Sequence, residues 1–342
     1  MYKIKASPGR TVIIHEKPYL YFSGTAYLGI PQDPDFRQLV VEGFERYGTN
    51  FGGSRLANVR FDIFDKTERV LLTLTGAPAA ISASSGTAAG QLLAHYFFDK
   101  AVMLATPDAH PSMMPPGHTA RKLSHNWTNE LPQILESIHE PVVLFCNAVN
   151  VLNVRKTDFS WMDKIPKDKS FTLVVDDSHF LGIGGKNGGG TYSVLKTPAH
   201  VELVVVSSLG KAFGVPAGII LGTEALIEGL WRTPLFGGGS PTVLAYLHAF
   251  VKGQFIYEKN RLQLQKNIAQ FRNGIQERPE LQTFEGYPVF SVKDENLADR
   301  LFKKDILLSS FPYPSPTSPR ITRIVINSLH EEGDIETLLS HL

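Results

Sequence analysis

The chain has 342 residues, a length that exceeds one ordinary hydrophobic core and predicts a large domain with a smaller one. A hydrophobic content of 43%, a charged content of 20% and a net charge of +1 give no electrostatic reason to expect nucleic acid or a membrane as partner. The single cysteine, Cys146, excludes an internal disulfide and a cysteine-based zinc site, and no apolar run reaches membrane-spanning length, so we expect a cytoplasmic protein.

The first predicted elements are a small hairpin in residues 11–28 and a helix in residues 35–47, which Gly48 ends. Residues 48–56 follow as a glycine-rich loop that contains Arg55. This loop is either a flexible turn or a segment that shapes the site of a neighbouring subunit. Another helix is predicted for residues 61–74.

The middle of the chain alternates strands with helices. Strands are predicted at residues 79–83, 102–104, 142–147, 172–175, 204–206 and 217–222, and helices at residues 86–98 and 128–138. This alternation predicts a mainly parallel sheet with right-handed crossovers.

The last third of the chain predicts a separate α+β unit. A long amphipathic stretch at residues 241–278 is expected to bridge the two domains, and strands follow at residues 289–292, 306–308 and 323–326. A helix at residues 296–303 and a closing helix complete the unit. We therefore expect an N-terminal segment (1–45), a large domain (46–240), and a bridging helix with a small C-terminal domain (241–342).

Four predicted strands of the large domain end in polar residues. In an open α/β sheet, ligands bind beyond the carboxyl ends of the strands, so these side chains are expected to meet. A helix start binds phosphate, a partly desolvated lysine forms a Schiff base, and an aspartate keeps a pyridine nitrogen protonated, so together they match pyridoxal 5'-phosphate. The four sets are Ser85-Gly86-Thr87, His110, Asp176 with His179, and Ser208 with Lys211.

Two motifs give this constellation a family resemblance. Asp176-Asp177-Ser178-His179 resembles Asp-Asp-Ala-His, and the stretch 208–214, Ser-Leu-Gly-Lys-Ala-Phe-Gly, resembles Thr-Phe-Gly-Lys-Gly-Phe-Gly, of the α-oxoamine synthases. These are fold-type I pyridoxal-phosphate enzymes. The resemblance implies an α/β fold: an aspartate-aminotransferase-like large domain with a mainly parallel sheet, plus a smaller α+β C-terminal domain.

The resemblance also assigns roles to single residues. It implies that Lys211 is the Schiff-base lysine, that Asp176 pairs with the pyridine nitrogen, and that His179 contacts the phenolic oxygen of the cofactor. His110 matches the histidine that stacks on the cofactor ring. The remaining matches are Ser85-Gly86-Thr87 and Ser208 near the cofactor phosphate, Arg323 as the receptor of the substrate carboxylate, Thr25 in place of a substrate-site asparagine, Asn147 in place of an acidic residue, and Ser240 near a position where a partner subunit supplies a hydroxyl.

The function that this resemblance implies is the decarboxylative condensation of a small amino acid with an acyl-CoA, in a homodimer with shared active sites. One alternative is an aminotransferase, which uses the same lysine and aspartate, and another is a non-catalytic scaffold that retains the cofactor fold. A metal site built from Asp108, His110, Asp176 and His179 would leave Lys211 and the phosphate turn without a role. No dinucleotide-binding glycine motif follows an early strand.

Overall fold

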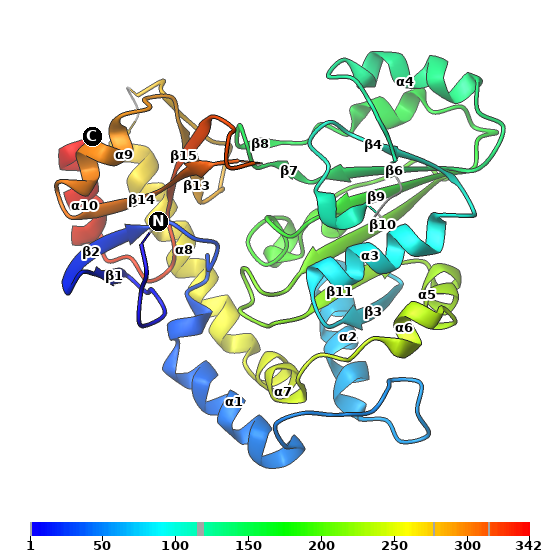
Figure 1. Ribbon diagram of the computed structural model, residues 1–342, viewed down its shortest axis with the longest axis horizontal. Coiled ribbons are helices and arrows are strands. Elements are labelled where there is room, and N and C mark those ends of the chain that lie inside the picture. Colours follow the sequence, from blue (N-terminus) through cyan, green and yellow to red (C-terminus); the bar gives the residue numbers. More distant parts are fainter. Residues whose placement is uncertain (1, 115–119, 276–277, 314) are drawn as a thin grey trace.

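The computed structural model describes residues 2–114, 120–275, 278–313 and 315–342. It contains a large domain and a smaller one, joined by a long helix (Figure 1). Both chain termini lie on the side of the smaller domain. In the described residues, the helices all lack the combination of length and apolar character needed to cross a membrane.

A seven-stranded sheet forms the centre of the large domain, in the order β3-β11-β10-β9-β6-β4-β5. Only β11 runs antiparallel to its neighbours β10 and β3, so the prediction of a mainly parallel sheet is confirmed. The strands are β3 (Ala79–Ala83), β4 (Val102–Ala105), β5 (Arg121–Lys122), β6 (Val142–Asn147), β9 (Phe171–Asp176), β10 (Val201–Ser208) and β11 (Gly218–Gly222).

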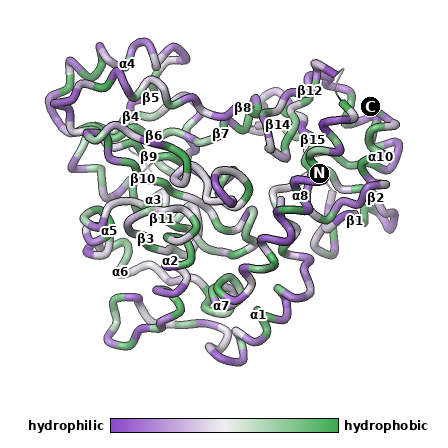
Figure 2. The backbone as a smooth tube through the Cα atoms, turned by 180° about the vertical axis from the view of Figure 1, so that it is seen from behind, coloured by the Kyte–Doolittle hydropathy of each residue, from purple (hydrophilic) through white to green (hydrophobic). Residues whose placement is uncertain are grey.

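Both faces of this sheet are buried, which explains why its strands are continuous apolar runs. Along β10, Val204 and Val206 belong to the cluster that contains apolar residues of α3 and α5, whereas Leu203 and Val205 belong to the cluster that contains residues of α2, α4 and α7. Figure 2 shows hydrophobic segments running through these central strands. The helices are α2 (Asp62–Thr75), α3 (Gly86–Phe97), α4 (Trp127–Glu136) and α5 (Glu224–Trp231), with the short α6 (Pro234–Gly238) after α5.

The predicted bridging stretch consists of two helices instead of one. α7 (Leu244–Lys252) ends at Gly253, and α8 (Gln254–Gly274) then runs into the smaller domain. The N-terminal helix α1 (Pro34–Tyr47) packs closely on α7, because a Cβ at Gly43 would lie 2.6 Å from the Ala245 Cα.

The smaller domain holds a six-stranded sheet in the order β1-β2-β14-β15-β13-β12. The N-terminal hairpin therefore does not stand apart: β2 pairs in parallel with β14, so the first strands of the chain extend the C-terminal sheet. The elements are β1 (Thr11–Ile14), β2 (Lys17–Phe22), β12 (Leu281–Gln282), β13 (Val289–Val292), α9 (Leu297–Phe302), β14 (Ile306–Pro312), β15 (Arg320–Val325) and α10 (Glu332–His341).

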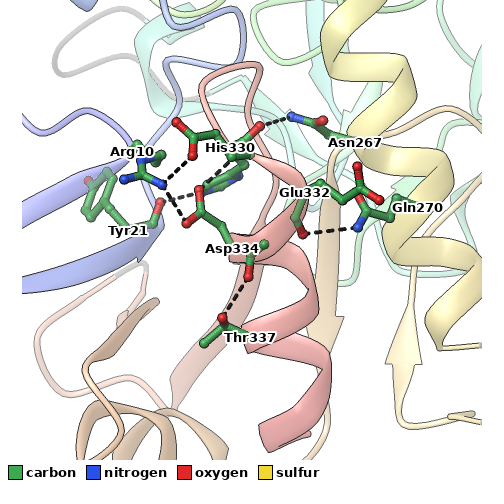
Figure 3. A network of polar contacts seen from close by, with 10 residues as sticks. Arg10, Tyr21, Asn267, Gln270, His330, Glu332, Asp334 and Thr337 are labelled. Carbon is green, nitrogen blue, oxygen red and sulfur yellow. Dashed lines mark hydrogen bonds and ion pairs between the residues drawn. The ribbon is translucent and has the colours of Figure 1, made fainter.

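Polar contacts also attach the hairpin to the C-terminal helices (Figure 3). The Arg10 guanidinium forms ion pairs with Glu331 and Asp334 at 2.9 and 3.0 Å, and the imidazole Nε2 of the buried His330 lies 3.1 Å from the Tyr21 carbonyl oxygen. Asn267 of α8 donates to the His330 carbonyl at 2.8 Å. The two ends of the chain thus belong to one domain.

The sequence pattern missed several short elements. They include α5, α6, β12 and the small hairpin formed by β7 (Val149–Asn150) and β8 (Arg155–Lys156). The hairpin lies between the two domains (Figure 1). Strands of two residues have too few positions for an alternation of apolar and polar side chains to be visible.

Candidate functional site

The polar residues that were predicted to follow the strands lie along one edge of the large sheet. β3, β4, β6, β9 and β10 all point the same way, and the pairing register places Asn147 beside Asp176 and Asp176 beside Val206. Their carboxyl ends therefore carry the candidate site, as expected for an open α/β sheet.

Lys211 lies in the tight connection between β10 and β11. The backbone closes there through bonds from Val215 N to the Leu209 carbonyl and from Leu209 N to the Ala217 carbonyl. The side chain is partly buried, and burial lowers the pKa of its amine, although the nearby Asp176 carboxylate acts in the opposite direction. Among the described residues, the amine has no hydrogen-bond or ion-pair partner. The amine is thus partly shielded from water and has no acceptor among these residues.

Asp176 and Asp177 have different surroundings at the end of β9. One oxygen of the half-buried Asp176 accepts from Ser178 N at 2.9 Å. Asp177 is fully buried, and its two oxygens accept from the backbone N and the hydroxyl of Thr191 at 2.8 and 2.6 Å. Burial raises the pKa of Asp177 to about 7. Asp177 therefore anchors the loop that ends at Thr191, and Asp176 is the acid that remains available to the site.

The two candidate histidines are held by different partners. His110 is exposed, its backbone N donates to Asn147 Oδ1 at 3.2 Å, and its Nδ1 lies 2.7 Å from the Ser112 hydroxyl. His179 Nδ1 lies 2.9 Å from the hydroxyl of the buried Tyr27. Burial lowers the pKa of His179 well below its usual value, and the nearby positive charges act in the same direction; these belong to Lys211, Arg323 and His110.

The start of α3 lies directly against the end of β10. The Ser85 hydroxyl caps the helix by accepting from Ala88 N at 3.0 Å. A Cβ at Gly86 would lie 2.6 Å from the Ser208 Cβ, and a Cβ at Gly218 would lie 2.1 Å from the Ser85 carbonyl oxygen. Only glycine fits both positions. The amides of the first turn, which includes the exposed Thr87, have no partner within the helix and can receive an anion.

Arg323 brings the smaller domain to the site. Its Nη1 donates to the Val151 carbonyl of the β7–β8 hairpin at 3.0 Å, while its buried Nε has no partner among the described residues. Burial lowers the pKa of Arg323, and the phenols of Tyr27 and Tyr287 lie near enough to offset part of this effect. An incompletely paired guanidinium is suited to bind a carboxylate.

Thr25 and Ser240 are both exposed, and each lines a separate cavity. Thr25 lines a cavity of about 170 Å³ that also contains Gly210, the neighbour of Lys211. Ser240 lines a cavity of about 120 Å³ with Ser84 and Ala88 near the start of α3. Each lines a cavity next to the candidate site, and in the described part of the chain neither forms a hydrogen bond with Lys211 or Asp176.

Arg55 is buried, whereas the sequence led us to interpret residues 48–56 as a flexible turn or as part of a neighbouring subunit's site. The side chain is 5% exposed, its Nη1 lies 2.7 Å from Glu68 Oε1, and it also donates to Ser82. Its guanidinium stacks over aromatic rings, including Phe64 at 4.4 Å. Arg55 is therefore a buried structural residue that does not face outward. Its ion pair with Glu68 compensates the cost of burying its charge.

This arrangement fits pyridoxal 5'-phosphate. It offers an unpaired amine at Lys211, an available acid at Asp176, an uncovered helix start and a partly unpaired Arg323, all close to one edge of the sheet. Within the ranges that the structure describes, no three His, Cys, Asp or Glu side chains are grouped so as to hold a metal ion.

A family model for class I and II aminotransferases matches residues 74–342, and the chain belongs to this family. Within it, the 8-amino-7-oxononanoate synthase of Pseudomonas fluorescens is 26% identical over 358 residues, which cover 99% of this chain and 91% of that protein. These findings confirm the expected resemblance to the α-oxoamine synthases and support pyridoxal 5'-phosphate as the cofactor.

Solved structures confirm the fold. Serine palmitoyltransferase from S. paucimobilis, solved with bound PLP and myriocin, has a TM-score of 0.82 at 18% identity, covering 100% of this chain and 90% of that one. An 8-amino-7-oxononanoate synthase from Francisella tularensis has a TM-score of 0.71 at 24% identity, covering 94% and 96%. The aspartate-aminotransferase-like large domain inferred from the motifs is therefore correct.

Proposed function

We propose that this protein is a pyridoxal-phosphate-dependent transferase that condenses a small amino acid with an acyl-CoA and releases carbon dioxide and free CoA. The observation that carries the proposal is the unpaired amine of Lys211, which lies beside Asp176 at the end of β10. The similarity to 8-amino-7-oxononanoate synthases supports this reaction over other reactions of the same cofactor.

The cofactor would be held by residues of the large domain. Lys211 would bind its aldehyde, Asp176 would pair with its ring nitrogen, and His110 would lie against the ring. The amides at Gly86 and Thr87, with Ser208 beside them, would receive the phosphate. Because Gly86 and Ser208 are already in close contact, the phosphate cradle is formed by the packing of α3 on β10.

When bound, pyridoxal phosphate supplies an electron sink for a carbanion at the α-carbon of an amino acid. The residues of the chain then have separate tasks. Arg323 binds the substrate carboxylate through its guanidinium group and so fixes the orientation of the α-carbon. Lys211 takes the α-proton, and the lowered pKa of its amine increases the fraction that is neutral and able to act as a base.

The acyl partner and the assembly follow from the same proposal. We expect an acyl-CoA as the second substrate and a homodimer in which both subunits contribute to each active site. Support comes from Ser240, which is exposed in the loop between α6 and α7 and lies near the start of α3.

The proposal is tested with glycine, alanine and serine, each incubated with and without an acyl-CoA. We expect exchange of the α-proton, followed by amino-acid-dependent release of the CoA thiol, in the native protein and in the exposed-site control Lys164→Ala. Lys211→Ala should lose both signals. Formation of a keto acid without thiol release would instead indicate an aminotransferase, and the absence of any amine turnover would indicate a non-catalytic scaffold.

A further inference from the structure

Tyr27 lies between β2 and α1 at the junction of the two domains. Its side chain is 2% exposed, and its carbonyl accepts from Ser328 N at 3.0 Å. The next residue, Leu28, accepts from the Asn260 amide of α8 at 2.9 Å. The backbone on each side of the phenol is thus fixed by the smaller domain and by the bridging helix.

The Tyr27 hydroxyl and the His179 imidazole form a hydrogen bond whose direction can be deduced. Burial raises the pKa of Tyr27 to about 12, so the phenol keeps its proton at neutral pH. Burial also keeps His179 neutral. Among the described residues, the Tyr27 hydroxyl has one unprotonated acceptor within hydrogen-bond distance. This acceptor is His179 Nδ1, at 2.9 Å. A buried hydroxyl without an acceptor is costly, so Tyr27 donates to Nδ1.

Tyr287 is a second buried phenol next to Tyr27. This residue is also 2% exposed, and its phenol interacts with that of Tyr27. Burial raises the pKa of Tyr287 well above its usual value, so this phenol also keeps its proton at neutral pH. Both phenols are therefore neutral, and the neutral imidazole of His179 offers its Nδ1 as an acceptor 2.9 Å from the Tyr27 hydroxyl.

We propose that Tyr27 is a positioning residue that holds His179 in the tautomer protonated at Nε2. Since Nδ1 is occupied as an acceptor, the imidazole has one N–H left, and this Nε2–H is the donor offered to the phenolic oxygen of the bound cofactor. The last step rests on the proposed function, whereas the tautomer itself does not.

The tautomer is measured by ¹⁵N NMR of the histidine-labelled protein without cofactor, with the His179 signals assigned from their loss in His179→Gln. We expect Nδ1 of the native protein to show the shift of an unprotonated nitrogen. Tyr27→Phe should give a mixture of tautomers, whereas Tyr287→Phe, which keeps the Tyr27 hydroxyl, should retain the Nε2-protonated form. Tyr246→Phe, on α7 beside Phe44, is the control for the loss of a phenol elsewhere. A proton on Nδ1 of the native protein, or an unchanged tautomer in Tyr27→Phe, would overturn the assignment.

The affinity for pyridoxal phosphate is measured on the same variants by equilibrium titration. Loss of one oriented hydrogen bond to the cofactor should weaken binding by about 3- to 10-fold in Tyr27→Phe, with the thermal midpoint showing that the variant is folded. Unchanged affinity in a Tyr27→Phe protein whose tautomers are mixed would overturn the step from the tautomer to the cofactor. Failure of the native protein to bind the cofactor at all would instead refute the proposed function and leave the tautomer assignment intact.

Discussion

Asp176 and Asp177 show how one step along a strand separates a functional acid from a structural one. Successive side chains of a strand point to opposite sides, so β9 directs its last carboxylate toward Lys211 and the next one into the loop at Thr191. Desolvation raises the pKa of Asp177, the buried partner of Thr191, to about 7. Asp176 lies at the sheet edge that holds Lys211. The motif resemblance assigns the functional role to Asp176, and the fold adds the reason why Asp177 is a structural acid: it is buried against Thr191.

Replacing Asp176 by Asn should reduce α-proton exchange by orders of magnitude, because an uncharged partner cannot keep the cofactor nitrogen protonated. The exchange is followed by proton NMR with glycine in heavy water. Asp163→Asn, an exposed aspartate outside the site, is the control and should leave the rate unchanged. Near-normal exchange in Asp176→Asn would contradict the role assigned to this carboxylate.

The residues with chemical roles could be predicted because they sit in local motifs. Asp176 is the last residue of β9, and His179, Lys211 and His110 lie within a few residues after β9, β10 and β4. Parallel strands bring such positions together. Tyr27 could not be predicted as the partner of His179, because the contact joins residues that are 152 positions apart. The same holds for Asn147, whose contact with His110 depends on the pairing of β4 with β6.

At the scale of elements, the contact between α3 and β10 determines the shape of the candidate phosphate site. The helix start and the strand end approach so closely that the first residue of α3 has no room for a side chain. A glycine there was expected from its place in a strand-to-helix turn, and the structure adds the reason, which is contact with Ser208.

Gly86→Ala should therefore weaken the binding of pyridoxal phosphate, because the added Cβ would lie 2.6 Å from the Ser208 Cβ and must push the helix start away from β10. Binding is measured by equilibrium titration, with thermal unfolding recorded in parallel. Gly333→Ala is the matched control: it lies in the first turn of α10, where an added Cβ meets nothing within 4 Å, and should leave cofactor binding unchanged. Equal affinities in the two variants would argue against a packed cradle.

For the whole molecule, the main departure from the expected organisation is the N-terminal hairpin, which is part of the smaller domain. The sequence identified the hairpin, but no local signal could reveal its pairing, because β2 and β14 are separated by most of the chain. His330 is part of this attachment: its Nδ1 accepts from Asn327 N, so its Nε2 carries the proton and donates to the Tyr21 carbonyl.

The attachment makes stability dependent on pH. Burial lowers the pKa of His330 from 6.5 to about 4, so between these values the unfolded chain binds a proton that the folded chain does not. The free energy of unfolding should thus fall as the pH falls from 6.5 to 4, and His330 should account for up to about 3 kcal/mol of this decrease. Above pH 6.5 His330 should make no contribution to the pH dependence. Urea unfolding of the native protein and of His330→Gln at several pH values measures the difference. His341→Gln, at the exposed end of α10, is the control, and parallel pH profiles for all three proteins would refute the assignment.

The assembly of the molecule can be tested through its exposed apolar side chains. Leu56, Val59 and Leu235 are 50%, 63% and 44% exposed. Leu56 and Leu235 belong to segments that touch each other, since the Ser54 hydroxyl donates to the Gly237 carbonyl at 2.7 Å and a Cβ at Gly237 would lie 2.8 Å from Leu56. Ser240 follows in the same loop. A second subunit placed here would cover these side chains and reach the candidate site, as the homodimer proposal requires.

The double variant Val59→Glu with Leu235→Glu should therefore be a monomer with greatly reduced activity, because four added carboxylates would be brought together in each dimer interface. Mass is measured by light scattering and activity by thiol release. Leu262→Glu, which charges a side chain that is 68% exposed on α8, is the control and should remain dimeric.

Mixing Lys211→Ala with a Ser240→Trp variant tests the shared site, because a mixed dimer contains one site with a native lysine and a native loop only when the two come from different chains. Activity that returns on mixing requires shared sites. No return of activity after confirmed subunit exchange would place the loop away from the partner's site. A double variant that stays dimeric would place the interface elsewhere.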